Sequence, residues 1–410
     1  MRNHKLFLYT KALSDFGSFM DLIVLNVVVY AATGSPVWLA ATMIARTVGG
    51  VLASLVSGVA ADKWNRKSIM LVTDIARAGL ILLLIPFPDP VVIIAVSCLI
   101  GFINSFFMVS FSAEIPQIFG QDKIIETNSL IARLTSVSLV TGFIGAGVIT
   151  EMLGYKYTLM IDAATYLLSA LVLWRLKWHM ALPETREAVR GFKQNIYSIG
   201  KDISEVLGYL KRAPMLLKIN VVFLVGAFAG SSHNLGIPLL AEDISPERQS
   251  FYYGLIWGVW GIGSVLATYT IPRLSIIRSD KIYMVFFVCA MFMSLGFISF
   301  LSSTVVPIVL AFAFLTGIFD AGFTTLHASL LQKADNYIRG RVFAVGMLLK
   351  SLGFALGFFA ATMLISNMSM PHMVWMLHGT LITTCLIAIG TSLFHGSKKR
   401  QVQVARDGSS

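Results

Sequence analysis

Six charged residues lie deep inside long apolar stretches of this sequence, where ionisable side chains are rare. Placing one such charge at the centre of a bilayer costs about 2.5–3.5 kcal/mol, so each is expected to face a bundle interior or a wet cavity. A buried carboxylate there can load and release a proton, and a buried cation can hold that carboxylate or a charged ligand. The six residues are Asp21, Arg46, Arg133, Asp162, Asp320 and Lys350.

Of the six, Asp21 and Arg46 are the residues best suited to form a protonatable site. Asp21 lies near the middle of the first apolar stretch, and Arg46 lies in the second. An acid opposite a cation can be switched by a proton or by a ligand, which predicts a protonatable coupling site. The alternative is a static ion pair that only stabilises packing. Asp15 precedes Asp21 by six residues and points about 120° away around the helix, so the two carboxylates face different neighbours.

The second half of the chain offers a corresponding group. Asp320 is the symmetric candidate for proton coupling, and Arg133 and Lys350 are expected to line the same substrate cavity. Asp162 is instead expected to be a polar residue of helix packing.

Three histidines also lie in apolar stretches. His233, His327 and His378 are scattered singly, and each is expected to be hydrogen-bonded within its span rather than to act as a ligand. His327 follows Asp320 by two helical turns and can belong to the same polar track.

The apolar stretches that hold these charges are each long enough to cross a bilayer, which takes roughly 20 residues of helix. Apolar residues make up 56% of the 410 and charged residues 13%, against about 25% charged in a typical globular protein. The predicted fold class is therefore an all-α membrane protein. Its twelve predicted spans are 8–32, 37–60, 68–87, 91–112, 127–150, 156–177, 217–240, 250–271, 282–301, 304–330, 342–365 and 373–395.

Basic residues alternate between the loops, which predicts the orientation. The even-numbered connections and both tails hold most of the loop Lys and Arg, whereas the odd-numbered ones contain only Lys156 and Arg248. Positive residues collect in cytoplasmic loops because they resist translocation. Both termini are therefore predicted to be cytoplasmic, in a multi-pass protein of a bacterial inner membrane. The net charge of +11 is explained by this topology and by anionic headgroups better than by nucleic acid.

The longest connection divides the chain into two halves of six spans. The two halves form a weak internal repeat, which is typical of transporters with a site between two repeats. Residues Gly191 to Arg212 of the connection carry apolar side chains at helical spacing and are predicted to lie along the inner membrane surface. The predicted units are an N-terminal six-helix bundle over 1–178, a cytoplasmic linker over 179–213, a C-terminal six-helix bundle over 214–397 and a cytoplasmic tail over 398–410.

A polar loop after the second span carries a recognisable motif. It reads Gly58-Val-Ala-Ala-Asp62-Lys63-Trp-Asn65-Arg66-Lys67 and resembles the GxxxD(R/K)xGRR/K signature loop of the major facilitator superfamily. Asn65 stands in the glycine position, where asparagine tolerates left-handed geometry. Further stretches resemble the branch with macrolide efflux proteins and the enterobactin exporter: Asp74-Ile-Ala-Arg77-Ala, Glu114-Ile-Pro116, Asn128-Ser129-Leu130, and Gln332 followed by Arg339-Gly340-Arg341-Val342-Phe343.

The resemblance covers essentially the whole chain. It implies twelve transmembrane helices in two six-helix pseudo-symmetric bundles, and a cytoplasmic charge cluster that latches them in the outward-open state. From the residues themselves, Asp62 can accept N–H bonds at a helix start, and Gly58 permits close helix approach. The alternative is that the basic loop residues only hold the orientation. The expected gate residues are Gly58, Asp62, Arg66, Asp74, Arg77 and Glu114.

Two features depart from the antiporter pattern that the resemblance implies. Phe143 takes the place of the proline in the fifth-span motif GPxxGG, although the close-packing glycines Gly142, Gly145 and Gly147 are present. The fourth-span arginine of drug antiporters is missing, because Ile103 to Ser112 holds no basic residue.

No enzyme is predicted, since the sequence lacks a phosphate-cradling GxxxxGK[ST], a nucleophile–base pair and metal-ligand spacing. The leading hypothesis is a secondary active transporter that exports an amphipathic small molecule, such as a drug or siderophore, by alternating access and proton antiport. It would need no cofactor beyond the proton gradient and would act as a monomer, with protons, membrane lipid and a small-molecule substrate as partners. The alternatives are a lipid or lysolipid flippase and an uncoupled uniporter or importer on the same fold.

Overall fold

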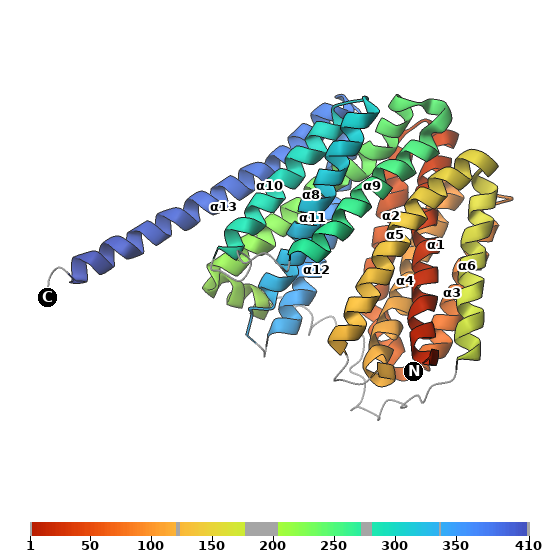
Figure 1. The fold of residues 1–410 in the computed structure, drawn as a ribbon, viewed down its shortest axis with the longest axis horizontal. Coiled ribbons are helices and arrows are strands. Elements are labelled where there is room, and N and C mark those ends of the chain that lie inside the picture. Colours follow the sequence, from red (N-terminus) through yellow and green to blue (C-terminus); the bar gives the residue numbers. More distant parts are fainter. Residues whose placement is uncertain (1, 120–123, 177–203, 272–280, 336–337, 408–410) are drawn as a thin grey trace.

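The computed structural model describes residues 2–119, 124–176, 204–271, 281–335 and 338–407. Twelve helices of at least 18 residues make up most of this described part (Figure 1). They are α1 Arg2–Thr33, α2 Pro36–Lys63, α3 Arg66–Leu83, α4 Pro90–Phe119, α5 Ile124–Leu153, α6 Tyr155–Arg175, α8 Pro214–Ile244, α9 Gln249–Thr270, α10 Ile282–Leu301, α11 Val306–Leu331, α12 Arg339–Ile365 and α13 Met370–Asp407, with a 3₁₀ turn η2 at Pro246–Arg248.

The helices confirm the predicted all-α membrane fold. Eleven of those described are long and apolar enough to cross a membrane, and the exception is α3 with 18 residues. Its sequence carries Arg66, Lys67, Asp74 and Arg77, which lowers its hydropathy. It ends at Leu83, short of the predicted limit at 87.

The helices pair in the same way in both halves of the chain, which confirms the expected pseudo-symmetry. In the first half α1 packs on α5 and α6, α2 on α4, and α3 on α4 and α6. In the second half α8 packs on α12 and α13, α9 on α11, and α10 on α11 and α13. Each helix of the first six thus has the partners of its counterpart, and the result is two six-helix bundles side by side (Figure 1).

Successive helices run in opposite directions between two faces of the molecule. We call the face on which α1 begins the N-face and the other the far face. In Figure 1 the two bundles meet at the top, which is the far face, and their ribbons diverge toward the N-face below. The main contact between the bundles is that of α5 with α9, joined by α2 with α12.

The linker was predicted to be amphipathic over residues 191–212, of which the structure describes 204–212. These residues form a helix that buries Val206 and Leu210 and exposes Leu207. Arg341 pairs with Glu205, and the Tyr209 hydroxyl accepts a hydrogen bond from the backbone N–H of Asp335. The described part of the linker is therefore attached to the second bundle.

Candidate functional site

Asp21 and Arg46 form an ion pair in the interior of the first bundle. Asp21 is completely buried, whereas 23% of the Arg46 side chain is exposed. Arg46 Nη1 bonds Asp21 Oδ1, and the Tyr166 hydroxyl of α6 donates to Asp21 Oδ2 over 3.2 Å. Ser18 Oγ lies 3.0 Å from the same hydroxyl. The predicted pairing is thus confirmed, while the sequence pattern gave no sign of Tyr166, which lies 145 positions from Asp21.

A second buried ion pair lies beside the first. Arg77 Nη2 bonds Asp74 Oδ1, and Ser169 Oγ donates to Asp74 Oδ2 over 2.6 Å. Ser14 of α1 lies within hydrogen-bond distance of both members of the pair. The Arg77 guanidinium also stands 4.5 Å from the ring centroid of Tyr166, a cation–π distance. Tyr166 therefore touches both ion pairs and joins them in one polar cluster.

The prediction that all gate residues form one charge cluster is wrong, because Asp74 and Arg77 lie apart from Arg66 and Glu114. Asp74 finds its partners in Arg77, Ser14 and Ser169, deep in the bundle. Arg66 lies at the N-face, where its Nη1 is 3.4 Å from Glu114 Oε1. The reason is the rise of the helix: eight residues separate Arg66 from Asp74, which is about 12 Å along the axis at about 1.5 Å per residue.

Two further expectations for the signature loop need correction. Asn65 has φ −61° and ψ 111°, which is extended rather than left-handed, and its side chain accepts the Ser68 N–H at 3.0 Å as the N-cap of α3. A Cβ built on Gly58 meets no described atom within 4 Å, so this glycine is not the point of closest helix approach in the described part of the chain. The close approach of α2 to α4 occurs at Gly49 instead, where a built Cβ would lie 2.0 Å from Cys98 O. The side chain of Asp62 lies outside the described part.

Arg66 nevertheless joins three helix ends. Its Nε donates to Ala61 O at the end of α2 over 2.8 Å. Its Nη1 reaches Ala113 O and Glu114 near the end of α4, each at 3.4 Å, while Arg66 itself begins α3. This fork geometry uses the planar guanidinium in a way that a lysine cannot reproduce.

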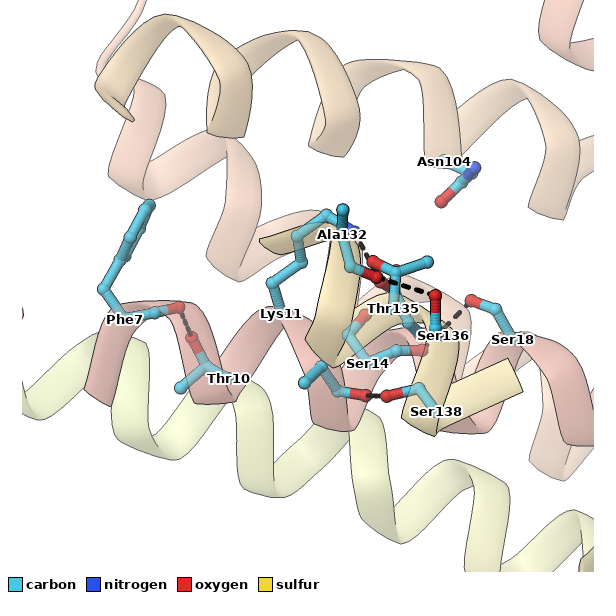
Figure 2. A network of polar contacts seen from close by, with 12 residues as sticks. Phe7, Thr10, Lys11, Ser14, Ser18, Asn104, Ala132, Thr135, Ser136 and Ser138 are labelled. Atoms are coloured by element: carbon cyan, nitrogen blue, oxygen red, sulfur yellow. Dashed lines mark hydrogen bonds and ion pairs between the residues drawn. The ribbon is translucent and has the colours of Figure 1, made fainter. Parts of the chain in front are cut away.

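Asp15 belongs to a separate group between α1 and α5. It pairs with Lys11 and accepts a hydrogen bond of 2.9 Å from Thr135 Oγ1. Figure 2 shows the neighbouring contact, in which Ser138 Oγ donates to Ala12 O over 2.7 Å. Asp15 and Asp21 thus face different helices, as their spacing predicts.

The remaining predicted charges lie on exposed or half-buried helix faces. Arg133 is exposed, and it precedes Val140 by seven residues, two turns along the same face of α5. Val140 contacts α9 at Gly261, so Arg133 lies on the side of α5 that faces the second bundle. Lys350 of α12 is exposed as well, and its charge acts on half-buried Asp320. Among the described residues, none of these three side chains makes an ion pair.

Two of the histidines expected to be single are in contact with each other. His233 Nδ1 lies 3.3 Å from His378 Nε2, and His378 Nδ1 lies 3.2 Å from Ser294 Oγ. The separation of 145 positions conceals this pair in the sequence. His327 stacks on the Phe223 ring with centroids 3.5 Å apart.

Contacts between the bundles near the far face form a closure that sequence reasoning missed. Asn26 Nδ2 donates to the Tyr253 hydroxyl over 2.9 Å, and both residues are buried. Nearer the surface, Arg248 Nε lies 3.3 Å from Glu151 Oε1. Each contact links a residue of the first bundle to one of the second.

Glycines let the two bundles meet closely at this closure. A Cβ built on Gly254 of α9 would lie 2.4 Å from Phe143 O and 3.0 Å from Gly147 Cα. Phe143, which replaces the antiporter proline, is buried with its ring centroid 5.7 Å from that of Trp257. The Phe143 side chain thus fills the interface, and α5 runs unbroken through it.

The geometry defines a class of protein: two six-helix bundles with a buried polar cluster in one of them, joined at one face. No group of three or more His, Cys, Asp or Glu side chains suited to a metal occurs in the described part of the chain. This is the architecture of a membrane transporter. The sequence model of the Major Facilitator Superfamily matches residues 10–358, and the chain belongs to that family, whose members are not enzymes.

Similar proteins support this family assignment. BacE of Bacillus amyloliquefaciens, assigned as a bacilysin exporter, is 24% identical over 403 residues, which is 94% of each chain. BacE of Bacillus subtilis is 23% identical over the same length. The nucleoside transporter NupG matches with a TM-score of 0.74 at 14% identity, over 95% of this chain and 99% of that one. A bacterial homologue of the iron transporter ferroportin, in an inward-facing state, matches at 0.73 and 14%, over 95% and 98%.

Proposed function

We propose that this transporter exports an amphipathic small molecule, of the drug or siderophore class, in exchange for protons. The ion pair between buried Asp21 and partly exposed Arg46 is the main support for this function. Charges are costly to bury inside a membrane, and apolar residues of similar volume are often at least as stable as a buried ion pair, so the presence of this pair is best explained by use. The assignment of the BacE relatives as exporters supports the direction.

The exposed cations support the choice of substrate region. Arg133 and Lys350 occupy corresponding helices of the two bundles, α5 and α12, and Asp320 lies within the field of Lys350. A charged group exposed within a membrane span is retained where it lines a water-filled space. We place the substrate between the bundles, on the N-face side of the closure, with an apolar part against the helices and a polar part near these residues.

The orientation completes the proposal. The Lys and Arg asymmetry of the loops supports a cytoplasmic location for both termini, in a protein of a bacterial cell membrane. The N-face is then cytoplasmic, and the closure at the far face makes the present conformation the one that loads substrate from inside. Alternating access would open the far face and close the N-face around Arg66 and Glu114.

A reporter fusion tests the orientation. A reporter that works only in the cytoplasm should be active when fused after Ser410 and inactive when inserted at Ser302, between α10 and α11. The Lys and Arg asymmetry of the loops is the physical basis. The reverse pattern of activity would overturn the assigned orientation.

Arg66 offers a test of the N-face gate. Arg66→Ala should lower transport at least tenfold with normal membrane insertion, because it removes the bonds to Ala61 O and Glu114. Arg66→Lys keeps the charge that orients the loop but not the fork. If only the charge matters, Arg66→Lys transports normally. If the fork matters, both variants fail.

Transport by the purified chain decides the function. Proteoliposomes are prepared with the N-face outward and offered a macrolide, enterobactin and bacilysin, with and without an acid lumen. Accumulation of any of these only with the acid lumen is the expected result. Equilibration that ignores the gradient would indicate a uniporter, and movement of a labelled lysolipid between leaflets would indicate a flippase.

A further inference from the structure

Asp162 of α6 is a fully buried carboxylate without a hydrogen-bond partner on either oxygen in the described part of the chain. The other two acids of the polar cluster, Asp21 and Asp74, each accept an ion pair and a hydroxyl hydrogen bond. An ionised carboxylate buried with no such partner is far costlier than the neutral acid. Asp162 is therefore the member of the cluster whose charge nothing satisfies.

The packing of α1 against α6 places Asp162 beside Asp21. A Cβ built on Gly17 would lie 2.4 Å from Asp162 Oδ1 and 2.3 Å from Thr165 Oγ1, so only glycine leaves room. Gly17 precedes Asp21 by one turn of α1, and residues so spaced share a face. Asp162 precedes Tyr166, the donor to Asp21, by one turn of α6. The two carboxylates are thus neighbours across one helix contact.

The charges of the cluster do not balance. Its acids number three, Asp21, Asp74 and Asp162, and its guanidinium groups two, Arg46 and Arg77. The charged groups that act on Asp162 are Asp21 of α1, Arg46 of α2 and Arg77 of α3, and among described residues α5 adds none. The Tyr166 hydroxyl on α6 is neutral. One bound proton makes the cluster neutral, and since the other acids are paired, it belongs on Asp162.

We propose that Asp162 holds the coupling proton in this conformation, and that Asp162 and Asp21 exchange Arg46 as that proton comes and goes. While Asp162 is neutral, Arg46 pairs with Asp21. Once Asp162 ionises, it competes for Arg46, on which its charge already acts. Arg46 is partly exposed, so its displacement changes the surface offered to substrate. This inference rests on the proposed proton antiport and names the group that carries the proton.

Infrared spectroscopy tests the proton on Asp162 without any substrate. Difference spectra of the full chain in lipid, between acidic and alkaline buffer, contain the carbonyl stretch of each acid that loses its proton. Asp162→Asn keeps the side-chain shape and should remove one such band. Asp89→Asn, in an exposed loop where asparagine can still cap α4, should keep it. An unchanged band in Asp162→Asn overturns the inference.

Asp21→Asn tests the exchange of Arg46. In this variant Asp162 can pair with Arg46 and stay ionised, so the same band should also disappear. A band that persists unchanged in Asp21→Asn would contradict the exchange. Asp162→Ser is measured in parallel. Its smaller side chain also lacks the carboxyl group, so it gives the same test if the asparagine amide of Asp162→Asn packs poorly.

Transport separates this inference from the proposed function. Asp162→Asn should lose gradient-driven accumulation and keep exchange of substrate across the membrane. If the wild-type chain accumulates substrate with the gradient and Asp162→Asn does so at the same rate, the inference fails and the proposed function stands. If the wild-type chain shows no gradient dependence, the proposed function fails, and so does the role of Asp162 in coupling.

Discussion

Asp21→Asn is expected to reduce gradient-driven transport to the level of empty liposomes while substrate exchange persists. The variant keeps the shape of the side chain but removes the negative charge that holds Arg46. Arg46 then has Asp162 as its remaining acidic neighbour, since the field of Asp162 acts on it. Asp21 and Asp162 can then no longer exchange Arg46 as a proton is bound and released. Uphill transport therefore stops, whereas substrate exchange, which needs no proton, continues. Proteoliposomes with and without an acid lumen measure both rates.

A purely structural ion pair gives a different result for the same variant. Removing one partner of a buried pair costs about 3–5 kcal/mol, which would appear as poor folding and low yield. Adding Arg46→Gln would then restore much of the stability, because no charge is left unpaired. Rescue of folding by the double variant, without loss of gradient-driven transport in it, would remove Asp21 from the mechanism and direct attention to Asp320.

Gly254→Leu is expected to abolish transport by preventing closure of the far face. Even a Cβ at Gly254 would stand 2.4 Å from Phe143 O, and backbone cannot yield as a flexible side chain can. Overpacking of this kind costs about 1–3 kcal/mol or more in a well-packed interface. The helices α5 and α9 should therefore separate, and the conformational equilibrium should shift toward an open far face.

Thiol labelling measures that shift. With the three native cysteines replaced by alanine, Asn26→Cys places a thiol at the buried contact with Tyr253. Labelling by an impermeant reagent from the far face should be slow in the parent and fast in the Gly254→Leu background. Gly79→Leu is the matched control, because a Cβ at Gly79 meets nothing within 4 Å. Equal labelling in both backgrounds would show that Gly254 does not control closure.

The sequence by itself determined the fold class and the residues with chemistry. Apolar stretches of bilayer length predict spans because backbone polar groups inside lipid must be satisfied within helices. The high cost of a charge in lipid singled out Asp21 and Arg46, and helical periodicity predicted that Asp15 would face another way. These inferences succeed because they depend on composition and spacing along one helix.

Some interpretations failed where spacing along one helix was not enough. Asn65 stands at the glycine position of the motif, where a left-handed turn is feasible for asparagine, whereas in the structure its backbone is extended and its side chain caps α3. Arg66 and Asp74 were placed in one cluster although the helix rise puts them at different depths. The contact of His233 with His378 was missed because nothing in the sequence relates α8 to α13.

Only the tertiary structure decided which side chains meet and which face is closed. Tyr166 reaches Asp21, Ser169 reaches Asp74, and Tyr253 reaches Asn26 because helices distant in the chain pack side by side. The lack of a hydrogen-bond partner for the Asp162 carboxylate among the described residues follows from the same packing. The sequence of a span does not reveal whether a polar residue within it has a partner. The physical reason is that periodicity fixes the face on which a residue lies, whereas the neighbour that this face meets is set by the packing of all twelve helices.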